Sequence, residues 1–261
     1  MKLKLYSLVI FISAFFVNNV NSQIYETVLD QGTGQNANIP VYSYYNYSYS
    51  QSIYLASEFL PAVQGSPTEI SKISFLNVSG NVNSTDNWTI LIGQTSKTSF
   101  QNGNDWEASA NLKTVYEGSV TANGANGWME IELDSTFTWD GVSNIVVGVR
   151  DQSSGYTFNQ IQWGTYDVTG DRSMRTHDDY SIPSLTSPPT AQSLYQSVPK
   201  IKFEHINYAD CQVQAPSGTY NPSVVQTSIC DNEVFEGTFN DINYITGLTY
   251  QWQMLDNGSW V

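Results

Sequence analysis

Basic residues are scarce in this sequence of 261 residues. It has 10 lysines and arginines against 24 aspartates and glutamates, which gives a net charge of −14 at neutral pH. Nucleic acids and anionic membranes are bound through clusters of basic side chains, so neither is expected as a partner. Beyond residue 22 the sequence also lacks an apolar run long enough to cross a bilayer, so no membrane insertion is expected.

Cysteine and histidine are nearly absent as well, with two residues of each type. A zinc site is not expected, because no histidine or further cysteine lies at ligand spacing from Cys211 and Cys230. In an exported chain these two cysteines predict one disulfide, and two unpaired thiols are the alternative.

Catalytic motifs are missing too, and no Gly-x-Ser-x-Gly nucleophile motif occurs. His177 precedes Asp178 in a polar run, so we expect an exposed loop histidine in preference to a catalytic His–Asp pair. His205 continues the inward alternation of a strand, which predicts a partly buried ring with satisfied nitrogens. Glu130 and Glu132 lie about 7 Å apart by strand geometry, as glycosidase carboxylates do, but any solvent-facing strand shows such a pair. The chain is therefore not expected to be an enzyme.

The first 22 residues have the pattern of a signal peptide. Lys2 and Lys4 precede an apolar run at residues 5–17, and small or modest side chains follow at residues 20–22. We predict cleavage after Ser22 and a secreted or extracellular protein, with attachment to the cell surface as an alternative. Loss of the two lysines takes the net charge to about −16.

The rest of the sequence favours β-structure. Charged residues make up 13% and aromatic residues another 13%, and β-branched and aromatic side chains suit pleated sheets. Apolar and polar residues alternate at residues 88–93, 128–133, 145–150 and 200–204, with Gly/Asn turn clusters between such runs. Residues 23–207 therefore predict a jelly-roll-like antiparallel β-sandwich. The Pro- and Ser-rich residues 181–199 are expected to form a long surface loop, or else a linker between domains.

A second unit is expected at residues 208–261. Cys230, the run at residues 248–253 and Trp260 are typical of the first strands of an immunoglobulin-like β-sandwich, with Trp252 as its core tryptophan. About 50 residues make only a partial domain, which would leave a sheet face and an edge uncovered. We therefore expect the remainder of a longer polypeptide to follow.

Tyrosines are crowded at residues 42–49, and this is the most suggestive sign of a binding site. Tyr45, Tyr47 and Tyr49 alternate and would share one side of a strand, where flat rings stack on sugars. The alternative is that this side faces the core. Trp106 and Trp163 are further candidates for ligand binding with the same ambiguity.

Calcium is the one cofactor that the sequence admits. The best cluster of acids comprises Asp167, Asp171, Asp178 and Asp179, and calcium takes six to eight oxygen ligands. None follows a known calcium-loop pattern, so solvated surface acids are the preferred interpretation.

Several stretches resemble a known group of proteins. They are residues 39–54 with Ile70-Ser71-Lys72-Ile73-Ser74-Phe75, residues 92–149 with Gly127-Trp128 and Trp139-Asp140-Gly141, and residues 172–203 with Pro188-Pro189. These are similar to the jelly-roll domains of secreted Bacteroidetes adhesins. Residues 211–261, with Gly247-Leu248-Thr249-Tyr250-Gln251-Trp252-Gln253, resemble the start of the immunoglobulin-like repeats that follow such domains. The resemblance implies a secreted surface protein that binds polysaccharide or other cells, and it carries no catalytic residues.

The function expected from these observations is a secreted cell-surface adhesion or carbohydrate-binding module without catalytic activity. A polysaccharide or a cell-surface component would be its partner. Two alternatives stay open: an accessory N-terminal segment of a larger secreted hydrolase (peptidase or glycosidase), and a structural spacer in a surface stalk. The spacer predicts that every tyrosine of residues 42–49 is buried.

Overall fold

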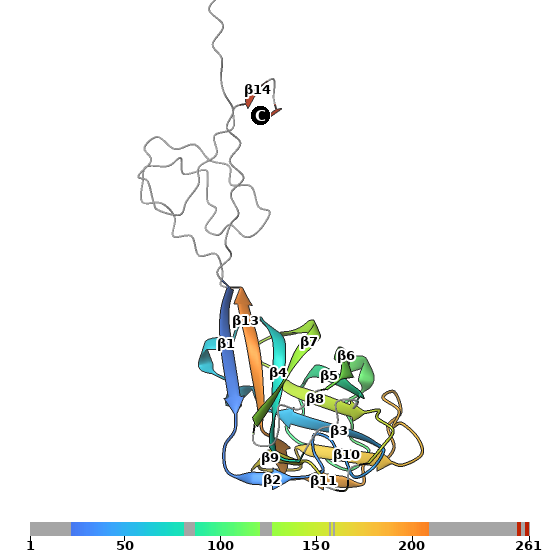
Figure 1. Ribbon diagram of the computed structural model, residues 1–261. Helices are drawn as coiled ribbons and strands as arrows, with labels where there is room; N and C mark the ends of the chain where they lie inside the picture. The colour runs from blue at the N-terminus through green and yellow to red at the C-terminus, as the bar shows by residue number, and fades with distance from the viewer. Residues whose placement is uncertain are drawn as a thin grey trace, which may run out of the picture. The chain divides into compact units, whose positions relative to one another are not determined.

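The computed structural model describes residues 22–80, 87–120, 127–156, 158, 160–208, 255–256 and 259–260. The chain falls into two compact units, Met1–Tyr208 and Ala209–Val261. In the first unit two antiparallel sheets pack as a sandwich (Figure 1), which confirms the predicted all-β fold. The only helical elements in the described part of the chain are three single 3₁₀ turns, η1 (Ala56–Glu58), η2 (Pro61–Val63) and η3 (Ser109–Asn111).

The larger sheet contains both ends of the first unit. Its order is β1 (Ser22–Leu29), β13 (Ile201–Tyr208), β4 (Thr68–Ser79), β9 (Gln162–Asp167) and β12 (Ser197–Pro199). Two further strands join it, β2 (Gly34–Asn36) against β9 and β7 (Gly127–Trp139) against β4. All these pairings are antiparallel.

The smaller sheet positions the candidate site. Its order is β11 (Ser193–Tyr195), β10 (Ser173–Asp178), β3 (Tyr47–Tyr54), β8 (Asn144–Asp151), β5 (Asn87–Thr95) and β6 (Leu112–Ser119). From β3 to β5, and again from β6 to β10, each successive strand lies in the opposite sheet. Such switching between two antiparallel sheets is characteristic of jelly rolls. The predicted surface loop at residues 181–199 differs from the structure at its end, where β11 and β12 pair with the two sheets.

The core between the sheets is built from the predicted alternation. Along β7, Met129 and Ile131 are buried, while Glu130 and Glu132 are exposed. Large aromatic side chains fill the centre, and the rings of Trp88 and Trp163 meet edge to face at 5.8 Å. Each fully buried large side chain contributes about 1.5–3 kcal/mol through the hydrophobic effect.

A second, smaller core lies on the other face of the smaller sheet. Ile53, Phe100, Val146 and Met174 are buried there, with Trp106 packed against them. The strands β3 and β8 are therefore buried on both faces, and simple alternation fails to describe them. A loop between β5 and β6, residues 96–111, provides this cover.

In the second unit the structure describes one short antiparallel hairpin, β14 (Leu255–Asp256) with β15 (Ser259–Trp260). Residues 1–21 of the predicted signal peptide lie outside the described residues. The same holds for Cys211 and Cys230 of the predicted disulfide and for Trp252 of the predicted immunoglobulin-like core.

Candidate functional site

Two of the five predicted ligand-binding aromatics are core residues. Tyr49 and Trp163 have exposed fractions of 0%. The Trp163 indole donates a hydrogen bond to the Val41 carbonyl at 2.9 Å and packs inside the sandwich. Tyr49 lies beneath the Trp106 ring, 5.0 Å away and nearly parallel to it. Neither side chain is accessible to a ligand, so the prediction of ligand binding is wrong for these two residues. Segments distant in the sequence cover both of them, and the local pattern could not show this cover.

Trp106 and Tyr47 are half-buried. The Trp106 indole nitrogen donates to the Pro189 carbonyl at 2.9 Å, and one face of its ring covers Tyr49. Trp106 therefore holds two loops against the sheet. Of the five predicted aromatics, Tyr45 is the one that joins a surface cluster of rings.

That cluster comprises Tyr42, Tyr44, Tyr45, Tyr156 and His177, and we refer to it as the aromatic cluster. The Tyr44 ring contacts Tyr45 at 5.5 Å and Tyr156 at 6.5 Å between centroids. Tyr42 lies 6.2 Å from Tyr44, and the His177 ring lies 3.7 Å from Tyr45. Tyr44 is 40% exposed and Tyr156 is 55% exposed. Phe158, 77% exposed, extends the row at 5.1 Å from Tyr156.

Hydrogen bonds to β3 and to the turn after β10 shape the segment that carries these tyrosines. Ser50 donates its hydroxyl to the Pro40 carbonyl at 2.6 Å, and the Tyr42 amide donates to the Ser48 hydroxyl at 3.1 Å. Asn46 joins the turn after β10, donating its side-chain amide to the Asp179 carbonyl at 2.7 Å. These bonds hold the backbone of the segment independently of any contact between the tyrosine rings.

Arg175 on β10 lies beneath the cluster and is only 5% exposed. Its guanidinium carbon is 4.5 Å from the centre of the Tyr42 ring. Its Nε donates to the Tyr195 hydroxyl and its Nη2 to the Ser193 hydroxyl, each at 3.2 Å. Its Nη1 contacts His177 Nδ1. Among the ion pairs of the described residues none involves Arg175, so an aromatic face and neutral acceptors surround this cation.

His177 differs from its predicted position in an exposed loop. It lies in β10, pairs with Ser48 of β3 in the sheet register, and is half-buried against Tyr45 and Tyr42. Burial and then the neighbouring Arg175 charge lower the pKa of His177 to about 4. The ring is therefore neutral near pH 7, and the cluster presents uncharged aromatic faces.

The four aspartates proposed for calcium do not come together. Asp167 ends β9 in the larger sheet, and Asp178 ends β10 in the smaller sheet. The Asp178 carboxylate accepts the backbone amides of Tyr180 and Ser181, and these bonds lower its pKa. Over the described ranges no three His, Cys, Asp or Glu side chains gather as a metal site would require.

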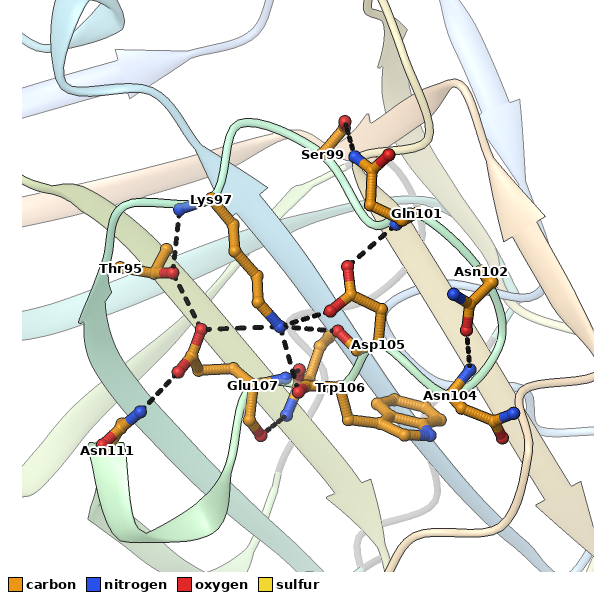
Figure 2. A network of polar contacts seen from close by, with 11 residues as sticks. Thr95, Lys97, Ser99, Gln101, Asn102, Asn104, Asp105, Trp106, Glu107 and Asn111 are labelled. Carbon is orange, nitrogen blue, oxygen red and sulfur yellow. Dashed lines mark hydrogen bonds and ion pairs between the residues drawn. The ribbon is translucent and has the colours of Figure 1, made fainter.

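A cluster of polar side chains lies within the loop of residues 96–111 that covers the smaller sheet, and Figure 2 shows it from close by. Glu107 is 7% exposed and accepts hydrogen bonds from the Thr95 hydroxyl at 2.8 Å and the Asn111 amide at 2.6 Å. The Lys97 ammonium, 2.9 Å from Asp105 Oδ1, lies between the two carboxylates. The lysine occupies the position that a metal cation would take between these carboxylates. Because Thr95 belongs to β5 and Glu107 to the loop, their hydrogen bond ties the loop to the sheet.

Three other residues considered in the sequence analysis are Glu130, Glu132 and His205. Glu130 and Glu132 face solvent as predicted, and Lys72 lies 3.9 Å and 2.9 Å from their carboxylates. His205 was predicted to be partly buried and satisfied, but it is 0% exposed. Its Nδ1 lies 3.0 Å from the Thr68 hydroxyl, and its Nε2 has no hydrogen-bond partner.

No family model matches the chain, and no curated protein matches its sequence. Within the part of the chain that the structure describes, no helix has the length and apolar character needed to cross a bilayer.

Proposed function

We propose that this chain is a secreted surface module that binds glycans through the aromatic cluster and performs no reaction there. The observation that carries the proposal is the group of contacting tyrosine rings around Tyr44 and Tyr156, two side chains with large exposed fractions. Exposed flat rings bordered by a few hydrogen-bonding groups suit the apolar faces and hydroxyls of sugars. A stalk spacer would not require such rings at the surface.

The polar groups beside the rings support binding in preference to catalysis. The Asp178 carboxylate is engaged by two backbone amides, and the Asp179 carboxylate accepts the Asn46 amide at 3.3 Å. Arg175 is buried beneath Tyr42. The described residues of the cluster therefore lack a free carboxylate pair of the kind that glycoside hydrolysis uses.

Secretion and kinship with the Bacteroidetes adhesin-type domains belong to the same proposal. The signal-peptide pattern supports export, and the crossing of the chain between two sheets supports a jelly-roll domain. N-terminal sequencing of the protein released by its native host tests the first point. A chain beginning at Gln23 is expected, and a retained Met1 would contradict export by this route.

The binding experiment compares the full chain with a Tyr44→Ala/Tyr156→Ala variant on a glycan array and by calorimetric titration with its best hits. We expect the double variant to lose at least tenfold in affinity, because two stacking faces are removed. Its melting temperature should stay close to that of the original chain, since exposed positions contribute little to stability.

Val142→Ala is the matched control. Val142 is 69% exposed but precedes β8, whereas the aromatic cluster lies beyond the other end of that strand. We expect this variant to bind like the original chain. Equal binding by the double variant and the original would remove the aromatic cluster as the site.

A further inference from the structure

The contact between Arg175 and His177 determines which ring nitrogen of His177 carries the proton. A guanidinium has only donors and keeps its charge in proteins. Because Arg175 Nη1 faces Nδ1 of His177, Nδ1 must accept. A neutral imidazole has one proton, which therefore lies on Nε2.

Part of the His177 ring reaches the surface within the aromatic cluster, because the residue is half-buried. The hydrogen bonds of His177 with named atoms use Nδ1 and the backbone, and Nε2 makes none of them. The Gln192 side chain also lies within hydrogen-bonding reach of the ring and favours its protonated form. Among these named bonds, Nε2 is therefore the ring nitrogen left for a ligand.

Charge around the cluster disfavours an anionic ligand. The Tyr42 ring covers the Arg175 guanidinium, which is almost fully buried, so this cation is shielded from the surface. Asp178 and Asp179 directly follow His177, and the whole chain has a net charge of −14. Uronate and sulfate groups would meet repulsion here.

We infer that His177 determines specificity for an uncharged glycan, donating its Nε2–H to a sugar oxygen while the sugar face lies on the rings of Tyr44 and Tyr45. This inference rests on the proposed function and names the ligand class of the same site. Arg175 is a positioning residue, because it acts only through the His177 ring. Aromatic stacking supplies contact area, and the directional hydrogen bond selects among sugars.

The proton position is measured directly by NMR. The chain has two histidines, so the long-range proton–nitrogen spectrum of the imidazole rings contains two patterns, which His177→Gln assigns. We expect an unprotonated Nδ1 and a protonated Nε2 for His177 at pH 7. In Arg175→Met the two tautomers should mix, because the donor that fixes Nδ1 is absent. A protonated Nδ1 in the original chain would overturn the inference.

Two substitutions separate the donor from the ring. His177→Phe keeps a ring against Tyr45 but has no N–H, whereas His177→Gln keeps an acceptor for Arg175 and a donor for the ligand. Calorimetric titrations of the full chain with cellohexaose, xylohexaose and mannohexaose are compared with polygalacturonate. For the neutral sugar that binds best, we expect at least a tenfold loss in His177→Phe and less than a threefold loss in His177→Gln. Thermal melting of both variants excludes unfolding as the cause.

The outcomes distinguish this inference from the proposed function. If Tyr44→Ala/Tyr156→Ala loses at least tenfold in affinity but His177→Phe binds like the original chain, the site stands and the donor role is wrong. Tighter binding of polygalacturonate than of every neutral sugar would overturn the uncharged ligand class. If none of the probes binds, the proposed function and the role of His177 both fall, whichever tautomer is found.

Discussion

At the scale of single residues, His205 is a titratable ring enclosed by the core. Its ring centroid lies 5.8 Å from those of both Phe59 and Trp139. Burial lowers the pKa of His205 to about 4, compared with an ordinary value of 6.5. Between these two values the unfolded chain binds a proton that the folded chain does not.

This difference predicts a loss of stability in mild acid. The contribution of His205 is complete above about pH 6.5 and is lost as the pH falls toward 4. Between pH 7 and pH 5 the free energy of unfolding should fall by about 2 kcal/mol because of this residue. Urea denaturation at the two pH values measures the effect.

The control is the double variant His205→Leu/Thr68→Val, which removes the titrating ring and the hydroxyl that it contacts. Its stability should change less between pH 7 and pH 5 than that of the original chain. His177, whose pKa is also lowered to about 4, is tested in parallel by His177→Gln. An unchanged pH dependence in the double variant would contradict the assignment to His205.

At the scale of elements, Glu107 fastens the covering loop of residues 96–111 to β3. The Glu107 amide donates to Gln51 Oε1 at 2.7 Å, and Gln51 donates to the Glu107 carbonyl at 3.0 Å and to the Tyr49 hydroxyl at 2.7 Å. Its carboxylate binds the Thr95 hydroxyl and the Asn111 amide. Backbone and side chain thus attach the same residue to the sheet.

We predict that Glu107→Ala lowers the free energy of unfolding by about 2 kcal/mol, because buried donors lose their acceptor. Glu107→Gln should cost less, since its amide oxygen still accepts one of these bonds. Glu132→Ala, a loss of an exposed and ion-paired glutamate, is the control and should cost under about 1 kcal/mol. Equilibrium denaturation compares the three, and equal effects at Glu107 and Glu132 would refute the fastening role.

The same loop explains why the sequence predicted the strands better than the site. Alternation is a local signal, and it located β5, β7, β8 and β13 from their own residues, although β8 proved to be buried on both faces. It could not reveal that Trp106 covers Tyr49, because these residues are far apart in the sequence and the cover depends on a loop conformation. Tyrosine density indicated the segment that carries three rings of the aromatic cluster, but the contribution of Arg175 and Tyr156 depends on strand pairing and a distant loop.

At the scale of the whole molecule, the first unit is closed by its own ends. Strand β1 pairs with β13 from Ser22↔Tyr208 to Leu29↔Ile201, and β13 lies between β1 and β4. The residues Ile201, Phe203 and His205 of β13 are all buried in the core. The last strand of the unit is therefore as necessary as any central strand.

We predict that a chain of residues 22–208 folds by itself, and that a chain of residues 22–200 does not. The shorter chain leaves β1 and β4 without their shared partner and removes large side chains from the core. Circular dichroism melting and amide NMR dispersion distinguish the two. A cooperative transition in the shorter chain, or failure of the longer one, would show that the unit closes differently.

The pairing of β1 with β13 also determines how the unit responds to tension. Because Ser22 and Tyr208 are opposite each other at one end of the ladder, stretching between them unzips the hydrogen bonds one after another. Figure 1 draws the ends of β8 and β10 on the side of the unit away from these strands. With the proposed glycan bound there, a pull between it and Tyr208 passes through both sheets instead of along this one ladder. We therefore expect the unit to open at a lower force when stretched between Ser22 and Tyr208 than when stretched from the proposed site.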